Sequence, residues 1–189
     1  MKLYCADLRG LKTEQARLPG RSRSRGSAFA ASLLAFALED AFGLESLPEM
    51  AETAKGKPFF PLFPDIHFSL SHTDTHVLAA VGAQPMGADI QTRRLRSLSG
   101  AKRLTTARER ADFNFFDLWA LRESLYKLTG AGNLRTLRFS RENGVIIPPV
   151  ADVNCRLYDD IPNCAAAVSS YGDDFPDAVI MVPIQYICT

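Results

Sequence analysis

The sequence predicts an α+β protein made of two similar lobes, each a helix packed on a small antiparallel sheet. Two strongly helical segments are each followed by apolar runs of strand length. Two stretches of equal length, Phe68–Val81 and Cys155–Val168, have Leu as their third residue and end in Ala-Ala-Val, which indicates a repeated unit. Because 189 residues suffice for two small lobes, we place an N-terminal lobe at residues 1–92 and a C-terminal lobe at 93–189, together one compact unit.

The N-terminal segments predict a strand, a basic loop and a helix. Apolar residues alternate in Met1–Ala6, which is typical of an edge strand. Arg17–Ser27 is basic and broken by Gly and Pro, and Ser27 is a suitable N-cap. Ala28–Phe42 is apolar almost all round, so we expect a buried helix, which Gly43 ends.

The middle of the chain predicts three short strands after a long loop. Pro48–Asp65 is rich in Pro and turn formers. The strands Ile66–Ser71, His76–Gly82 and Met86–Gln91 are separated by gaps that suit tight antiparallel connections. The charged stretch 93–113 that follows is predicted to be partly helical.

The clearest helix runs from Asn114 to Gly130. Trp119, Glu123 and Tyr126 fall on a side of this helix that differs from its core stripe. The core stripe consists of Leu118, Leu121, Leu125 and Leu128. Four strand candidates complete the chain: Leu134–Ser140, Asp152–Asp159, Cys164–Tyr171 and Ala178–Tyr186.

Composition excludes several classes of protein. A net charge of +1 argues against a general polyanion binder, so any phosphate contact must come from local clusters. The four cysteines form no C-x-x-C pair, which argues against a zinc knuckle or a redox motif. Charged residues come too early in the sequence for a signal peptide, and no apolar run approaches the roughly 18 residues of a membrane span. We therefore expect a reduced, cytoplasmic protein.

Two carboxylates are the strongest candidates for chemistry. Asp89 follows Gly87 and Ala88 near the end of an apolar run, and Glu123 lies one helical turn before Lys127. Each has an ordinary interpretation, as a solvated strand end or as a surface Glu–Lys pair. Mg²⁺, however, binds through one or two carboxylates together with substrate phosphates. Asp89 and Glu123 could form such a pair, one from each lobe.

Histidines and arginines offer weaker candidates. His72, Asp74 and His76 have the spacing of a metal hydrolase cluster, although they are expected to span a turn. The basic loop suits either solvation or phosphate contact, since arginine binds phosphate through forked donors. Nucleic-acid binding is disfavoured because the net charge is small and no aromatic residues interleave with the arginines.

Four short motifs together resemble a known family. They are Gly56–Pro58 (GKP), Phe68–His72 (FSLSH), Gly87–Ile90 (GADI) and Trp119–Lys127 (WALRESLYK). Their order, spacing and residue types are similar to those of the 4′-phosphopantetheinyl transferases, of the Sfp type that has two lobes in one chain. The resemblance covers roughly residues 55–138. It implies that type's fold and the transfer of the 4′-phosphopantetheine arm of coenzyme A to a carrier-protein serine, with release of 3′,5′-ADP.

The resemblance also implies roles for individual residues. Asp89 and Glu123 match the carboxylates that bind Mg²⁺. Because the carrier serine is a poor nucleophile at neutral pH, it needs a general base, for which Glu123, or a metal-bound water that it orients, is the best candidate. Lys127 matches the lysine that contacts the diphosphate. Contacts to the phosphates of coenzyme A are implied for Lys57, Ser71 and His72, and in the basic loop for Arg21 and Arg25.

The chain departs from the family pattern at three positions. Gln91 stands where many members have a second acidic residue, Arg122 replaces a lysine, and Ser69 replaces an asparagine. Gln91 supports one alternative, a catalytically weak relative that only binds coenzyme A; the metal hydrolase is another.

The expected partners are an acyl or peptidyl carrier protein of fatty-acid, polyketide or nonribosomal peptide synthesis, and coenzyme A. Residues 93–110 are the predicted part of the carrier surface, because a carrier protein presents an acidic helix. We expect a monomer that binds neither nucleic acid nor membrane.

Overall fold

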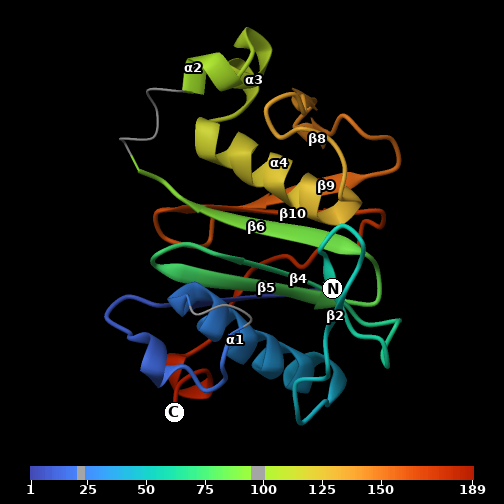
Figure 1. Ribbon diagram of the computed structural model, residues 1–189. Helices are drawn as coiled ribbons and strands as arrows, with labels where there is room; N and C mark the ends of the chain where they lie inside the picture. Colours follow the sequence, from blue (N-terminus) through green and yellow to red (C-terminus); the bar gives the residue numbers. More distant parts are fainter. Residues whose placement is uncertain (21–23, 95–100) are drawn as a thin grey trace.

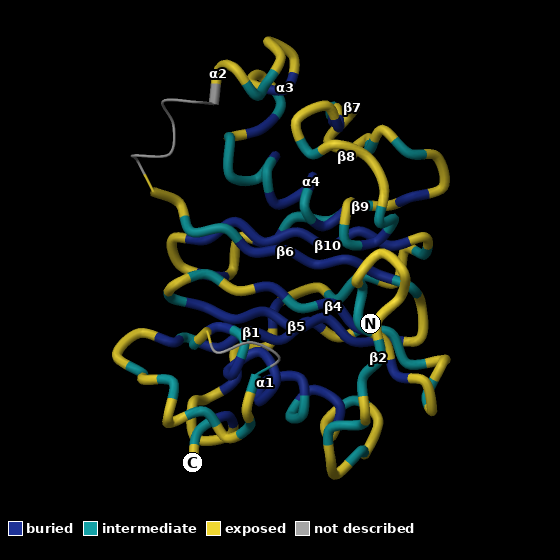
Figure 2. Tube along the Cα trace, in the orientation of Figure 1, coloured by how far each residue is buried: buried dark blue, intermediate teal, exposed yellow. Residues whose placement is uncertain are grey.

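A computed structural model describes residues 1–20, 24–94 and 101–189. It is a mixed α+β structure in which two small sheets lie between two long helices (Figure 1). Three apolar clusters hold these layers together, one between each helix and its sheet and one between the two sheets. Figure 2 shows the result, with buried strands in the middle and exposed loops around them.

The first sheet has the strand order β11-β1-β5-β4 and is covered by helix α1. Strand β1 pairs with β5 in antiparallel fashion and with β11 in parallel. The prediction of an edge strand at the N-terminus was therefore wrong, because residues from the end of the chain cover its other side. The strands are β1 (Lys2–Asp7), β4 (His67–His72), β5 (His76–Gly82) and β11 (Ile180–Met181).

The second sheet has the order β6-β10-β9, is antiparallel and is covered by helix α4. Strand β6 follows β5 in the sequence but pairs with β10, so the predicted tight hairpin between them was wrong. Sheet membership crosses the predicted lobe boundary at residue 92, since β6 joins the second sheet and β11 the first. These strands are β6 (Met86–Thr92), β9 (Asn154–Tyr158) and β10 (Cys164–Ser170).

Strands β4 and β6 connect the two sheets through serine side chains. Ser69 Oγ accepts a hydrogen bond of 2.8 Å from the amide of Ala88, and Ser71 Oγ accepts one of 3.3 Å from Ile90. Strand β6 lies at the end of its sheet and pairs with β10, so these hydroxyls satisfy backbone donors on its other side. Ser69 and Ser71 thus help to fix the strand that carries Asp89.

Both long helices have well-defined caps. Helix α1 (Arg25–Phe42) begins after Ser24, which accepts from the amide of Ser27, so the helix starts earlier than the predicted cap at Ser27. It ends at Gly43, as predicted, with φ of 70°. Helix α4 (Phe115–Thr129) confirms its prediction, since Asn114 caps its start and Gly130 its end.

Shorter elements complete the structure. Leu134–Ser140 is mostly a loop rather than the predicted strand, because turn hydrogen bonds to Asn133 fold back its first half.

The described residues contain no helix long and apolar enough to cross a membrane. The short helices are η1 (Thr13–Gln15), α2 (Ala101–Leu104), α3 (Ala107–Asp112) and η3 (Ile184–Tyr186), and the short hairpins are β2 (Ala51–Glu52) with β3 (Pro58–Phe59) and β7 (Ser140–Glu142) with β8 (Val145–Ile147).

Candidate active site

Asp89 is a buried carboxylate with a cationic partner. It lies on β6, is 3% exposed, and its Oδ1 accepts hydrogen bonds from Lys127 Nζ at 2.6 Å and Ser71 Oγ at 2.7 Å. Its Oδ2 accepts a 2.6 Å bond from Gln91 Nε2. A carboxylate can be buried in this way because its charge is paired and its oxygens are hydrogen-bonded.

Gly87 allows the helix that carries Lys127 to reach Asp89. Met86, Ala88 and Ile90 pack between the sheets, so the alternating residues Gly87 and Asp89 face α4. A Cβ atom on Gly87 would lie 2.0 Å from the carbonyl oxygen of Ser124 in α4. Only glycine therefore permits this contact between strand and helix backbone.

Glu123 lies near Asp89, one helical turn before Lys127. Burial raises the pKa of Glu123, and the negative charge of Asp89 raises it further, whereas Lys127 and a hydrogen bond with Trp119 act in the opposite direction. Asp89 and Glu123 both line one cavity of about 590 Å³. We call it the carboxylate cavity; Gln91, Leu104, Phe115 and Trp119 are also part of its wall.

A second cavity, of about 460 Å³, is lined by three lysines, Lys55, Lys57 and Lys127, and by Ser27 and Phe68 among others. We call it the lysine cavity. Lys57 donates a 2.9 Å hydrogen bond to the carbonyl of Met86, and burial lowers its pKa. A concentration of ammonium groups in a hollow suits an anionic ligand such as a phosphate.

His72 lies where the two cavities meet, since it lines both. Its ring packs on α1 at Gly26, where a Cβ would be 2.3 Å from Nδ1. Sequence reasoning missed Lys55 as a site residue. The signal was the Lys-Gly-Lys turn, in which Gly56 has φ of 78° and both lysines reach the same cavity.

Only one of the two predicted arginines of the basic loop lies among the described residues. Arg21 lies outside the described residues. Arg25 donates from Nη1 to the carbonyl of Leu11 at 2.9 Å and from Nη2 to that of Asp74. Its guanidinium thus ties the start of α1 to neighbouring loops, and its contact with a phosphate stays a prediction.

The His72–Asp74–His76 pattern does not form a cluster. The three residues span the turn between β4 and β5, and Asp74 pairs with the exposed Arg94. His76 is buried, with its Nδ1 2.9 Å from the hydroxyl of Thr75. Across the residues described, no group of three or more His, Cys, Asp or Glu side chains could hold a metal ion. The geometry gives the hydrolase alternative no support.

The carboxylate cavity fits a hard cation. Its two carboxylates supply the oxygen donors that Mg²⁺ prefers, and Mg²⁺ commonly takes its remaining ligands from water and substrate phosphates. The lysine cavity beside it supplies positive charge for such phosphates. The arrangement is thus suited to chemistry on a phosphate ester.

Comparison with known proteins gives a consistent set of relatives, although no protein-family model matches the chain. The chain is 32% identical over 148 residues to the 4′-phosphopantetheinyl transferase Sfp of Bacillus subtilis (strain 168), covering 69% of this chain and 66% of that protein. A second 4′-phosphopantetheinyl transferase of Bacillus subtilis is 30% identical over 144 residues, 67% of this chain and 64% of the relative. One from Bacillus pumilus is 37% identical over 87 residues, 41% of this chain and 37% of the relative. The aligned region spans just under two thirds of the length of the first two relatives.

Proposed function

Because the chain belongs to the Sfp-type 4′-phosphopantetheinyl transferase family, we propose that it transfers the 4′-phosphopantetheine group of coenzyme A to a serine of a carrier protein. The other product is 3′,5′-ADP, and the acceptor is an acyl or peptidyl carrier protein. The activity is that of a holo-acyl-carrier-protein synthase. One observation supports it most directly: Asp89 and Glu123, far apart in the sequence, line one cavity beside Lys127.

Asp89 and Glu123 would hold Mg²⁺, the cation this family typically requires. When bound, the ion supplies positive charge that neutralises the diphosphate of coenzyme A and polarises its phosphorus. Ser71 and Gln91 orient Asp89 through hydrogen bonds to its two oxygens. With Gln91 in place of a second acid, the protein would offer two carboxylates to the ion.

Glu123 is the general base of the proposed reaction. The serine of a carrier protein is a poor nucleophile at neutral pH and needs a proton acceptor. Glu123 lines the carboxylate cavity and is therefore a carboxylate within the site that could accept it, directly or through a metal-bound water that it orients. Glu123 would take the proton of the serine hydroxyl as the oxygen attacks phosphorus and the bond to the ADP oxygen breaks.

The lysines stabilise the leaving group. Negative charge develops on the ADP phosphate as its bond breaks, and a positioned cation lowers the energy of that state. Lys127 lines the lysine cavity and contacts Asp89 of the carboxylate cavity, so its ammonium lies between the two. Lys57 and His72 would hold the remaining phosphates of coenzyme A.

A mass-shift assay tests this proposal. Purified protein, coenzyme A and Mg²⁺ are incubated with apo carrier proteins from fatty-acid, polyketide and peptide synthesis. We expect the mass of one phosphopantetheine group to appear on a carrier, and Asp89→Asn or Glu123→Gln to lower the rate by roughly 10²–10³-fold. Binding of coenzyme A without transfer to any carrier would instead favour the weak relative that Gln91 suggests.

Three finer proposals accompany this function. The unit would consist of two similar lobes, formed mainly by residues 1–92 and 93–189, with β6 and β11 each joining the sheet of the other lobe. It would act as a monomer and work in the cytoplasm. The paired arrangement of α1 on one sheet and α4 on the other supports the first of these.

A further inference from the structure

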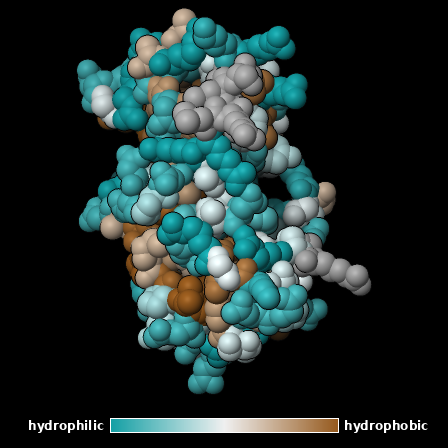
Figure 3. All heavy atoms as spheres, turned by 90° about the vertical axis from the view of Figure 1, so that its left-hand side faces the viewer, coloured by the Kyte–Doolittle hydropathy of each residue, from teal (hydrophilic) through white to brown (hydrophobic). Residues whose placement is uncertain are grey.

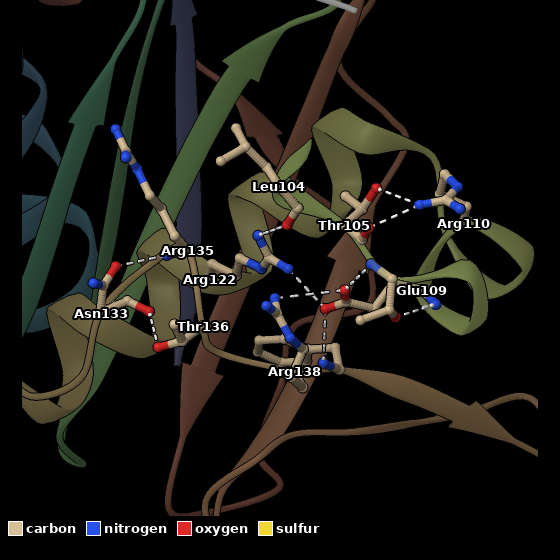
Figure 4. Close-up of polar contacts among 11 residues, drawn as sticks. Leu104, Thr105, Glu109, Arg110, Arg122, Asn133, Arg135, Thr136 and Arg138 are labelled. Carbon is tan, nitrogen blue, oxygen red and sulfur yellow. Dashed lines mark hydrogen bonds and ion pairs between the residues drawn. The ribbon is translucent and has the colours of Figure 1, made fainter. Parts of the chain in front are cut away.

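Arg122 and Glu109 form a buried ion pair outside both cavities. Arg122 is 0% and Glu109 1% exposed, and Arg122 Nη2 donates to Glu109 Oε1 at 2.7 Å. The other terminal nitrogen of the same guanidinium group, Nη1, donates to the carbonyl oxygen of Leu104 at 2.9 Å (Figure 4). The arginine next to Glu123 in the sequence thus points away from the carboxylate cavity.

The pair joins four segments of the chain. Glu109 Oε2 accepts from the amide of Thr106 at 2.8 Å, which closes a capping box at the start of α3. Glu109 Oε1 also accepts a longer bond of 3.4 Å from the amide of Phe139. Arg122 itself lies in α4 and holds the last residue of α2. Helices α2, α3 and α4 and the segment before β7 therefore meet at two side chains.

This pair is poorly suited to be a simple source of stability. Removing two charges from water is costly, and well-packed apolar residues often replace such a pair without loss of stability. Arg122 Nε is buried and has no hydrogen-bond partner in the part of the chain that the structure describes. The pair instead fixes the positions of the backbone groups that it bonds, those of Leu104, Thr106 and Phe139.

The group it holds most directly belongs to the wall of the carboxylate cavity. Leu104 lines this cavity together with Asp89, Glu123 and Trp119. The described lining of the lysine cavity, in contrast, includes no residue of α2 or α3. A displacement of α2 and α3 would therefore change the first cavity and leave the second one intact.

We propose that Arg122 and Glu109 are positioning residues, which hold α2 and α3 as the acceptor side of the carboxylate cavity. This inference rests on the proposed function. If coenzyme A occupies the lysine cavity, the carrier serine would reach Glu123 through the carboxylate cavity, whose wall includes Leu104 of α2.

The surface at that end of the molecule suits an acidic acceptor. Lys102, Arg103 and Arg110 are exposed on α2 and α3. Figure 3 shows that the upper end of the molecule, where Figure 1 places these helices, is largely hydrophilic. Opposite charge at an interface steers encounter and fixes orientation. The positioning pair would thus set both the cavity wall and the angle of this basic surface.

Three variants separate positioning from stability. Arg122→Met leaves the buried Glu109 with one cationic partner, the half-exposed Arg138, whose Nη1 lies 3.7 Å from Glu109 Oε2. Arg122→Met with Glu109→Met removes both charges and should fold about as stably as the wild type. Arg122→Lys keeps the positive charge at this position, but a lysine cannot bond Glu109 and Leu104 with the forked geometry of a guanidinium group. Arg156→Met, which removes an arginine from an exposed ion pair on β9, is the matched control.

The measurements are the KM for a carrier protein, the Kd for coenzyme A by calorimetry, the melting temperature, and acrylamide quenching of Trp119. Trp119 is the only tryptophan of the chain and lines the carboxylate cavity, so its quenching reports on the wall without any substrate.

We expect Arg122→Met and the double variant to raise the carrier KM by about ten- to a hundredfold. The Kd for coenzyme A should stay within about twofold, because the lysine cavity is intact. Trp119 should be quenched more readily in both variants, Arg122→Lys should be intermediate, and the control should match the wild type.

Two results would overturn the inference. One is a double variant that regains both the wild-type melting temperature and the wild-type carrier KM, since the pair would then serve stability alone. The other is unchanged quenching of Trp119 in Arg122→Met. If the wild-type protein modifies no carrier, the proposed function fails, and the quenching series still decides whether the pair holds the wall.

Discussion

Gly87→Ala should impair the site without touching a residue that carries charge. The new Cβ would lie 2.0 Å from the carbonyl oxygen of Ser124 and 2.5 Å from the amide nitrogen of Leu128, both backbone atoms of α4. Ordinary contact begins near 3.4 Å, so the shortfall at Ser124 is 1.4 Å. Backbone atoms of a packed helix cannot rotate away as a side chain can. Helix and strand must therefore separate by about this distance.

The separation has two measurable consequences. Overpacking of this kind costs about 1–3 kcal/mol, which lowers the melting temperature by roughly 2–12 °C in a protein of this size. Helix α4 carries Glu123 and Lys127, whereas Asp89 lies on β6, so the same displacement moves the two halves of the site apart. A misplacement of about 1 Å can lower a rate about a hundredfold. We expect kcat/KM for transfer to fall by at least that factor.

Gly172→Ala is the matched control for this variant. A Cβ at Gly172 would meet nothing within 4 Å, and its backbone does not have positive φ. Its melting temperature and kcat/KM should equal those of the wild type. If Gly87→Ala melts and transfers like this control, the close contact between β6 and α4 does not set the spacing of Asp89 and Glu123, and the reasoning fails.

Three further predictions concern the charges around the site. Because burial and Asp89 raise the pKa of Glu123, ionised Glu123 destabilises the metal-free fold. Glu123→Gln should therefore melt higher than wild type near pH 8. Thermal scans should show this gain shrink as the pH falls below the raised pKa and disappear near the ordinary value of 4.5. Gln91→Glu adds a third carboxylate beside Asp89 and should lower the Mg²⁺ concentration for half-maximal transfer several-fold. If the Mg²⁺ titration is unchanged, residue 91 is not close to the metal ion. Burial opposes ionisation of Glu109, but hydrogen bonds from Thr106 and Arg122 outweigh it and lower the pKa of Glu109 below the ordinary 4.5. Glu109→Gln should therefore be less stable than the wild type, with the full difference above about pH 5. In acid denaturation series the difference should shrink as the pH falls further.

Local patterns in the sequence predicted the parts of the fold that depend on neighbours in the chain. Helix α4 was predicted with its caps, Asn114 and Gly130, because capping depends on residues within one turn. Pairing between distant strands was not predictable in this way. Strand β1 is internal only because residues about 175 positions later lie beside it, and β6 leaves its sequence neighbour β5 to pair with β10.

In the candidate site, too, some residues could be predicted from the sequence and others could not. The resemblance of the four motifs grouped Asp89, Glu123 and Lys127. Asp89 and Glu123 line the carboxylate cavity, and Lys127 lines the lysine cavity and bonds to Asp89. The sequence does not distinguish basic residues that face a cavity from those used inside the fold. Arg25 and Arg122 both bond to backbone carbonyls or a buried carboxylate, a use that depends on the tertiary arrangement alone.

Binding of a single divalent ion by both carboxylates can be measured directly with Mn²⁺ as a spectroscopic substitute for Mg²⁺. Electron paramagnetic resonance titrations in the presence of coenzyme A should give one tightly bound Mn²⁺ per chain in the wild type. Asp89→Asn and Glu123→Gln should each abolish this tight binding, because the two side chains share the ion. If either variant binds Mn²⁺ as the wild type does, the two carboxylates do not share a metal and the proposed site is wrong.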